Sequence, residues 1–303
     1  MKLLELRAMT MKILHVTSMR AATLPFEEGY ITLRGAGRLF LRVPELGGAA
    51  RAEVLLTHGL GEHSARYAHV AEAFAESGLR LWAYDLHGHG RSGGRRGDAP
   101  DYATFLDDLA AVLEQIPREA PLFLLGHSLG GQITLNFLLE RGALCQDRCR
   151  GVVAASPWLR LAFEPSRWRL LLAAAALRIW PSFRQRRPND RLLLSRDLAH
   201  LDALAAPELM YHRISARLFS LVVKAGEAAL AAAPRLRTPL LLIHGGDDRV
   251  TSREATEEFE QAAGATDKTL KIYPESRHET FNDFGRERVL KDVIAWIDAR
   301  LVS

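Results

Sequence analysis

The chain has 303 residues, 48% of them hydrophobic and 25% charged, with a formal net charge of +4. These values are ordinary for a soluble globular protein, and the length allows one large α/β domain with an inserted subdomain. Residues 1–19 contain no uninterrupted apolar segment. This excludes a signal peptide and a membrane span there, so we expect a cytoplasmic protein. Cys145 and Cys149 are expected to be free thiols, and they are too few to form a metal site.

Predicted strands and helices alternate along the chain. Two β-like runs, 29–33 and 39–43, flank a glycine-rich turn and predict a hairpin. Apolar runs then predict strands at 53–58, 79–84, 122–125, 151–155, 239–244 and 269–273. Sequence typical of helices covers 67–76, 102–115, 132–140, 252–262 and 286–301. Because continuously apolar strands separated by helices are typical of parallel sheets, we predict an α/β fold with a mostly parallel central sheet covered by helices on both faces.

A long segment interrupts this alternation late in the sheet. Residues 157–238 show no strand signal and much helix-forming sequence. We therefore predict a helical cap (lid) over the carboxyl ends of the strands, where open α/β sheets bind ligands. The core domain is predicted to consist of residues 26–156 and 239–303. Residues 1–25 would be an N-terminal extension that can be disordered.

Positive charge is concentrated in the predicted cap. It holds 14 Arg or Lys against 6 Asp or Glu, whereas the rest of the chain is net negative. It also holds an apolar run at 170–177 and the tryptophans Trp158, Trp168 and Trp180. Most of these large apolar side chains are expected to be buried. A cationic surface with tryptophans also suits an anionic lipid surface, so peripheral contact of the cap with a membrane stays open.

The most informative motif is Gly-His-Ser-Leu-Gly at 126–130. It follows the apolar run 122–125 and precedes a helix-like segment, which is the strand–turn–helix context of a nucleophile elbow. The glycines permit a turn sharp enough to expose the serine, and the N-terminus of the next helix favours negative charge nearby. Ser128 is therefore predicted to be a nucleophile.

A serine nucleophile needs a base, which in elbow enzymes comes last in the chain, in a loop after a strand. His278 lies in the loop after the predicted strand 269–273 and fits this position. His200 and His212 lie in the predicted cap and His244 lies within a strand. We interpret these three as structural, and we predict that His278 is the base.

The base in turn needs a carboxylate to orient it, and the oxyanion needs two backbone N–H donors. Asp247 and Asp248 both follow the predicted strand 239–244, and spacing alone does not choose between them. One N–H donor is expected from the residue after the nucleophile, Leu129. The other is expected from the loop after an early strand, where Leu60 is best placed.

Two further motifs complete a resemblance to a known family. His58–Tyr67 (HGLGEHSARY) and Asp85–Gly93 (DLHGHGRSG), together with the elbow, resemble the α/β-hydrolases grouped as monoacylglycerol lipases and bacterial lysophospholipases, a serine aminopeptidase-type family. The resemblance extends from about Phe26 to the C-terminus and is weak in the predicted cap. It implies the α/β-hydrolase fold and a Ser-His-Asp triad.

The resemblance also implies which aspartate is catalytic. In that family the catalytic aspartate directly precedes a basic–hydrophobic pair, here Arg249-Val250, so Asp248 is the match and Asp247 a turn residue. The sequence departs from the family at His87, where arginine is usual. We expect this loop to pack beneath the site, with little consequence for activity.

The motifs and the resemblance predict a serine hydrolase that cleaves carboxylic esters of single-chain lipids, monoacylglycerol or lysophospholipid. Ser128, His278 and Asp248 would act through an acyl-enzyme, with no metal or organic cofactor and no nucleic-acid partner. Alternatives on the same fold are a short-chain carboxylesterase, a proline-type aminopeptidase and an acyltransferase. A non-enzyme alternative is a ligand-binding receptor on a hydrolase scaffold.

Overall fold

The computed structural model describes residues 24–301, except 34–36, 165, 167, 169–170, 172–174, 176 and 187–189. Its central sheet has eight strands, in the order β1-β2-β4-β3-β5-β6-β9-β10. Their bounds are Phe26–Thr32 (β1), Arg38–Pro44 (β2), Ala52–Thr57 (β3), Leu79–Tyr84 (β4), Leu122–His127 (β5), Cys149–Ala155 (β6), Leu240–Gly245 (β9) and Lys268–Tyr273 (β10). β2 pairs antiparallel with β1 and β4, and the pairs from β4 to β10 are parallel. The predicted hairpin and the mostly parallel sheet are both confirmed.

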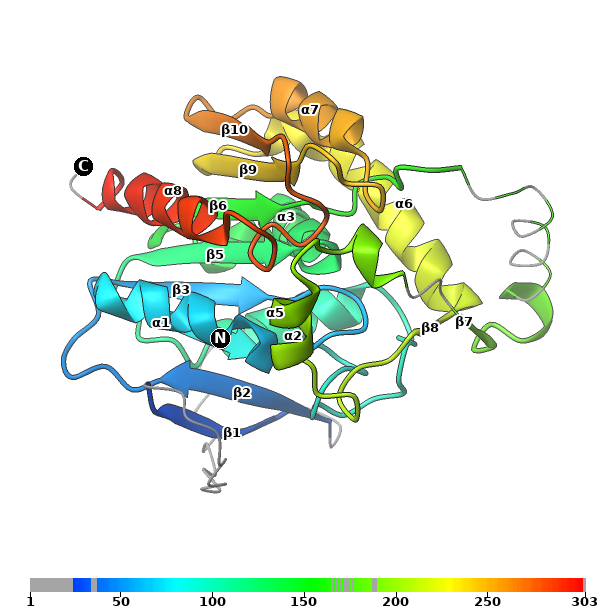
Figure 1. Ribbon diagram of the computed structural model, residues 1–303, viewed down its shortest axis with the longest axis horizontal. Helices are drawn as coiled ribbons and strands as arrows, with labels where there is room; N and C mark the ends of the chain where they lie inside the picture. Colours follow the sequence, from blue (N-terminus) through cyan, green and yellow to red (C-terminus); the bar gives the residue numbers. More distant parts are fainter. Residues whose placement is uncertain are drawn as a thin grey trace, which may run out of the picture.

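Helices cover both faces of this sheet (Figure 1). Their bounds are Ala68–Glu76 (α1), Ala103–Leu113 (α2), Leu129–Arg141 (α3), Leu198–Ala203 (α5), Ala216–Ala232 (α6), Arg253–Ala262 (α7) and Arg286–Asp298 (α8). α1 and α8 bury their apolar side chains against one face, and α2, α3, α6 and α7 against the other. Successive residues of a strand point to opposite faces. In β3, Val54 and Leu56 therefore pack with α1 and α8, while Leu55 packs with α2 and α3.

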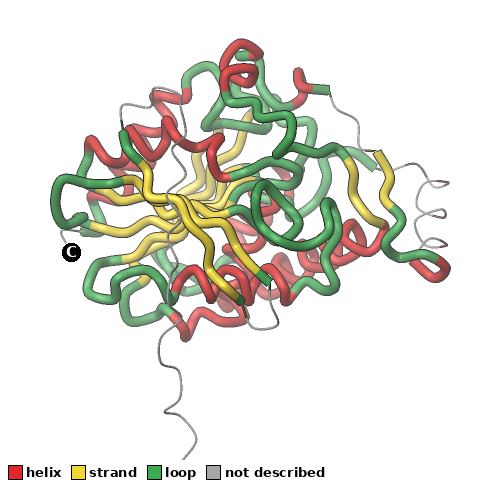
Figure 2. Tube along the Cα trace, turned by 90° about the horizontal axis from the view of Figure 1, so that it is seen from below, coloured by secondary structure: helices red, strands yellow, loops and turns green. Residues whose placement is uncertain are grey.

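Between β6 and β9, which are neighbours in the sheet, the chain leaves the core for the segment 157–238. This segment contains a two-stranded antiparallel ribbon, β7 (Arg184–Arg186) with β8 (Arg213–Ser215), which lies apart from the main sheet (Figure 2). The expectation that the segment holds no strand is therefore wrong. The two strands are three residues long and show no apolar alternation, so their pairing leaves no periodic signal in the sequence.

The helix α6 returns from this ribbon to the core. Ser215 caps its N-terminus by accepting a hydrogen bond from the Leu218 N–H at 2.9 Å. Two polar side chains of α3 also bind α6: Gln132 donates to the Val222 carbonyl at 2.9 Å, and Asn136 donates to that of Ala225 at 3.2 Å. Because α3 follows the elbow directly, these bonds fix α6 relative to Ser128.

The tryptophans of this segment differ in their surroundings. Trp158 is buried, but Trp168 and Trp180 are 58% and 59% exposed. The expectation that most of the three are core is therefore wrong. The apolar run 170–177 lies largely outside the described residues. Within the described part of the chain, no helix is both long and apolar enough to span a membrane.

The two cysteines, Cys145 and Cys149, are both free, as expected from the sequence. Each thiol instead donates a hydrogen bond to a backbone carbonyl, that of Gly142 for Cys145 and that of Gly151 for Cys149. The segment between α3 and β6 therefore contains local hydrogen bonds of these thiols and no disulfide between them.

Asp108, on α2, is a buried carboxyl group without a cationic partner in the described residues. Its Oδ2 accepts a hydrogen bond from the His87 N–H at 3.2 Å, and burial raises its pKa to about 7. Between pH 4 and pH 7 the folded protein therefore retains a proton that the unfolded chain has lost. The free energy of unfolding consequently falls as the pH rises through this window.

We predict that Asp108→Asn, which keeps an acceptor for the His87 N–H but cannot ionise, raises the free energy of unfolding at pH 8 by about 1–3 kcal/mol. At pH 5 the gain should be much smaller, because the wild-type carboxyl is then mostly protonated. Urea unfolding at both pH values measures the difference. The control is Asp107→Asn, which changes an exposed neighbour paired with Arg141. A gain from Asp108→Asn that is equal at the two pH values would contradict the assignment.

Candidate active site

Ser128 lies in the tight turn between β5 and α3, as predicted. Its φ of 55° and ψ of −117° fall in a region that non-glycine residues rarely occupy. Three backbone hydrogen bonds hold this strained conformation: the Ser128 N–H donates to Ala155 at 2.9 Å, and its carbonyl accepts from Gln132 at 3.1 Å and Trp158 at 3.0 Å. The surrounding structure thus sets the direction of the Ser128 side chain.

Glycines on either side of Ser128 allow this turn to pack closely. A Cβ at Gly130 would lie 2.0 Å from the Thr57 carbonyl oxygen, and one at Gly126 would lie 2.3 Å from the Gly130 oxygen. Any larger residue would therefore push α3 away from β3 and β5. The two glycines of the motif are required by this backbone contact.

His278 contacts both other residues of the predicted triad. Its Nε2 lies 2.9 Å from Ser128 Oγ, and its Nδ1 lies 2.9 Å from Asp248 Oδ2. An ionised carboxylate can only accept a hydrogen bond, so Nδ1 carries the proton and Nε2 is left to accept from the Ser128 hydroxyl. All three side chains are buried.

Asp248 is held as an anion by the loop that follows β9. Its Oδ1 accepts from the N–H groups of Val250 at 2.8 Å and Thr251 at 3.1 Å, and its Oδ2 accepts from the Thr251 hydroxyl at 2.9 Å. Burial opposes the charge, but His278 and His244 together hold the pKa of Asp248 far below its usual range. Asp247 instead faces outward and pairs with arginines.

The electrostatics around His278 favour its protonation. Burial alone would lower the pKa of His278, but the Asp248 carboxylate and its hydrogen bond raise it above 6.5. The His127 ring lies 4.9 Å from the His278 ring, between centroids. Burial and the nearby His278 lower the pKa of His127 to about 4, so His127 is neutral at pH 7.

The residues predicted to supply oxyanion donors lie next to Ser128. Leu129 is the first residue of α3, whose first-turn N–H groups have no acceptor within the helix. Leu60 lines the same cavity as Ser128, and a Cβ at the preceding Gly59 would lie 3.2 Å from the Ser128 Cβ. The two segments therefore approach the nucleophile from different strands.

A buried ion-pair network, which we did not predict, joins the Gly59–Leu60 loop to the His278 loop. Arg66 donates to Glu279 Oε2 at 2.7 Å and also pairs with Glu62. Glu62 in turn accepts from the Gly59 N–H at 2.6 Å. The sequence held a signal for part of it, since Glu62 and Arg66 stand four residues apart and Glu279 directly follows His278.

The network carries one net negative charge. Burial would raise the pKa of Glu62, but Arg66 and the neighbouring histidines lower it to about 2. Burial would lower the pKa of Arg66, but Glu279 and Glu62 raise it well above its usual value. Glu62 and Arg66 are therefore both ionised at neutral pH.

The loop with the second quoted motif, residues 85–93, lies beneath the site, as expected. The Asp85 carboxylate accepts from the Ser64 N–H at 2.7 Å, and the Leu86 N–H donates to His58 Nε2 at 3.0 Å. His87 itself is half-buried and directed away from the triad, against Gly94. From the sequence we interpreted His244 as only structural. Its Nε2 lies 3.2 Å from Asp248 Oδ2, so it also contacts a residue of the predicted triad.

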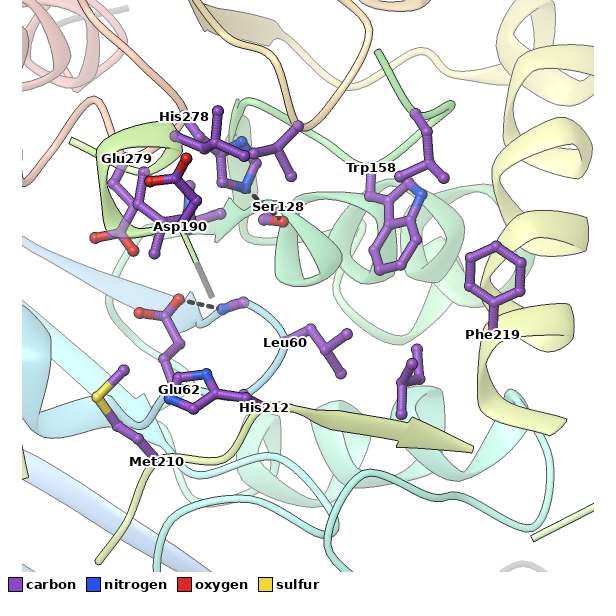
Figure 3. A pocket seen from close by; sticks show the side chains of 18 of the residues that line it. Leu60, Glu62, Ser128, Trp158, Asp190, Met210, His212, Phe219, His278 and Glu279 are labelled. Atoms are coloured by element: carbon purple, nitrogen blue, oxygen red, sulfur yellow. Dashed lines mark hydrogen bonds between the residues drawn. The ribbon is translucent and has the colours of Figure 1, made fainter. Parts of the chain in front are cut away.

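Ser128 opens into a cavity of about 270 Å³ with two chemically different ends (Figure 3). Trp158 and Phe219 lie at the apolar end. Glu62, His212 and other polar side chains lie at the opposite end, with the serine between them. This shape suits an amphipathic molecule whose reactive group sits between an apolar and a polar part.

Comparison with known proteins assigns this architecture. A family model described as serine aminopeptidase, S33, matches residues 48–284. The chain is 31% identical over 258 residues to a monoacylglycerol lipase of Mycolicibacterium smegmatis, covering 83% of this chain and 89% of that protein. It is 32% identical over 251 residues to an abhydrolase domain-containing protein of Dictyostelium discoideum, covering 82% of this chain but only 26% of that longer protein.

A solved structure agrees with these matches. The crystal structure of the Paleococcus ferrophilus monoacylglycerol lipase superposes with a TM-score of 0.77 at 30% identity, covering 86% of this chain and 99% of that one. The similarity to this structure therefore extends over most of the chain.

We predict that Arg66→Ala lowers the free energy of unfolding by about 3–5 kcal/mol, because it leaves two buried carboxylates without a counter-charge. The matched control is Arg160→Ala, which removes an arginine that also contacts two carboxylates, Glu227 and Glu258, but at the surface. That change should cost about 1 kcal/mol or less. Urea unfolding at pH 7 measures both, and equal losses would contradict a special role for the buried network.

Proposed function

The chain belongs to the serine aminopeptidase S33 family of α/β-hydrolases, in the group similar to monoacylglycerol lipases, and we propose that it hydrolyses carboxylic esters of single-chain lipids. The observation that carries this proposal is the hydrogen-bonded chain Ser128–His278–Asp248 in a cavity with one apolar and one polar end. Monoacylglycerols and lysophospholipids both have this division into one acyl chain and one polar head.

In the proposed mechanism, Ser128 Oγ attacks the ester carbonyl while His278 Nε2 takes its proton. Asp248 stabilises the resulting imidazolium, and the N–H groups of Leu60 and Leu129 bind the oxyanion. His278 then protonates the departing alcohol, which leaves an acyl-Ser128 ester. A water molecule, deprotonated by His278, releases the fatty acid and restores the hydroxyl. No step requires a metal or an organic cofactor.

The pairing within the polar network bears on the choice between a lipid ester and a peptide as substrate. Glu62 and Glu279 line the polar end, but both are paired with Arg66. A proline-type aminopeptidase would need a free carboxylate to bind the substrate amine. Glu62 and Glu279 do not offer one, but Asp190 also lines the cavity and forms no ion pair within the described residues. The pairing of Glu62 and Glu279 favours the lipid ester, and Asp190 keeps the peptide as the alternative substrate.

We also propose that the predicted cap, residues 157–238, contacts a lipid surface at the periphery of the membrane. Large apolar side chains of this segment are exposed to solvent: Phe163, Trp168, Leu171, Ile179, Trp180, Phe183 and Leu192. Apolar and aromatic groups next to arginines are the combination that binds to the surface of an anionic bilayer.

We predict that a fluorophosphonate probe labels the folded protein at Ser128 and that Ser128→Ala abolishes both labelling and ester turnover. Turnover is measured with p-nitrophenyl esters of increasing chain length and with monoacylglycerols. Preference for long acyl chains is expected, because the apolar end of the cavity holds them. Activity on acetate and butyrate esters alone would indicate a short-chain esterase, and a protein that resists labelling would indicate a receptor.

We predict that kcat/KM for ester hydrolysis rises with pH and reaches half its maximum above pH 6.5, because only neutral His278 accepts a proton and Asp248 raises its pKa. Asp248→Asn removes the negative charge, so the midpoint should shift to lower pH while the maximal rate falls by about 10⁴-fold. The matched control is Asp247→Asn on the adjacent, outward-facing residue. An unchanged midpoint in Asp248→Asn would contradict the assigned pairing.

A further inference from the structure

A second cavity, beside the catalytic one, is lined by four arginines. Arg96, Arg184, Arg186 and Arg213 surround it, together with Tyr211 and His212. No carboxylate of the described residues lines it. Within the described part of the chain, none of the four guanidinium groups forms an ion pair with an acidic side chain. We call these four residues the arginine cluster.

The register of the β7–β8 ribbon creates this cluster. Arg186 lies directly opposite Arg213, and Arg184 lies opposite Ser215. Arg184, Arg186 and Arg213 therefore share one face of the ribbon, because side chains two residues apart on a strand point the same way. Like charges directly opposite each other destabilise a strand pair. The ribbon thus holds positive charges close together, and their repulsion destabilises it. A bound anion would offset this repulsion.

Asp98, a carboxylate next to the ribbon, is already used by other groups. Asp98 accepts from the Ser215 hydroxyl at 2.7 Å and from Arg217 at 2.7 and 3.2 Å. These bonds, with the Ser215 N–H donating to the Gly97 carbonyl at 2.8 Å, fix the ribbon to the core. Asp98 therefore attaches the ribbon to the core through Ser215 and Arg217, in addition to the bond from Arg184 to the Arg96 carbonyl.

Arg96 supplies an independent sign that an anion belongs here. Its side chain donates one hydrogen bond to the Gly90 carbonyl, while its Nη1 is buried and has no partner. A buried N–H group without an acceptor is unfavourable, and a charged one more so. Arg184 spans the same cavity and donates to the Arg96 carbonyl at 2.9 Å. Arg96 and Arg184 therefore both border the space that the anion would occupy.

The chemistry of the cluster selects phosphate. A guanidinium group presents a planar set of N–H donors that matches phosphate oxygens, and groups of arginines are a general means of binding phosphate esters. A carboxylate ligand carries one negative charge, which fewer than four arginines can balance. A phosphate monoester carries up to two negative charges and three oxygens that accept hydrogen bonds, so it matches the four arginines better.

The two cavities share lining residues. Arg186 and His212 line both, while Gln185 and Ile214, on the opposite face of the ribbon, line only the catalytic cavity. An ester at Ser128 with a polar head at the His212 end of its cavity would therefore direct that head toward the cluster. We propose that the arginine cluster binds the phosphate group of a phosphorylated single-chain lipid while its ester lies at Ser128.

This inference rests on the proposed function for the identity of the ligand, but phosphate binding itself can be measured without catalysis. We expect inorganic phosphate and glycerol 3-phosphate to bind the wild-type protein in isothermal titration calorimetry at constant ionic strength. Ser128→Ala should bind them equally. A protein that binds phosphate but hydrolyses no ester would contradict the proposed function and leave the site intact.

The decisive variant is Arg213→Glu. It should weaken phosphate binding at least tenfold, since a charge-assisted hydrogen bond is replaced by repulsion. It also places a carboxylate opposite Arg186, so the ribbon should be stabilised and the melting temperature should not fall. Arg213→Gln is the neutral second variant. The matched control is Arg118→Glu, the same charge reversal at an exposed residue. Arg118 precedes the amino end of β5, whereas the site lies beyond the carboxyl ends of the strands.

Substrate kinetics then identify the source of the phosphate. A lysolipid with a phosphate monoester head and a monoacylglycerol with the same acyl chain are compared. Arg213→Glu should lower the ratio of their kcat/KM values at least tenfold, and Arg118→Glu should not change it. An unchanged ratio with lost phosphate binding would overturn the role in substrate recognition and assign the site to phosphate from solution or from neighbouring lipids. Failure of the wild-type protein to bind phosphate would overturn the site altogether.

Discussion

The geometry of the site depends on one buried cation, Arg66. It contacts Glu62, which holds the Gly59 N–H, and Glu279, which directly follows His278. The Gly59–Leu60 loop and the His278 loop come from distant parts of the chain, and the Arg66 guanidinium group joins them. Because two carboxylates share it out of water, none of the three can move without leaving a charge unpaired, which costs several kcal/mol. The network therefore restricts both loops to one arrangement.

The second constraint is the parallel sheet itself. The carboxyl ends of β5, β9 and β10 meet at one edge, so the loops that follow them bring Ser128, Asp248 and His278 together although they are far apart in sequence. The strained backbone of Ser128 then aims its hydroxyl at His278. Close packing of Gly130 against β3 and of Gly126 against Gly130 holds this strained turn in place. The sheet places the residues approximately, and close backbone contacts set their final geometry.

Elements with a strong local signal could be predicted from the sequence, and those formed by distant pairing could not. The buried strands β3 to β6 read as apolar runs, and topology placed His278 after the last of the sheet strands. The choice of Asp248 over Asp247 needed the resemblance, because the loop direction that separates them depends on hydrogen bonds to Thr251. The β7–β8 ribbon left no pattern in the sequence, because its two short segments bring their arginines together only when they pair.

The ribbon is also the element on which the proposed head-group specificity depends. One of its faces presents Ile214 and Gln185 to the catalytic cavity, and the other presents Arg184, Arg186 and Arg213 of the arginine cluster. A single small element thus touches the ester-binding space on one side and a cationic space on the other. In the proposed function, Ser128, His278, Asp248 and the buried network govern ester cleavage, whereas the ribbon lies beyond the polar end of the cavity. Changes in its side chains can therefore alter which head group is accepted without disturbing the hydrogen bonds among Ser128, His278 and Asp248.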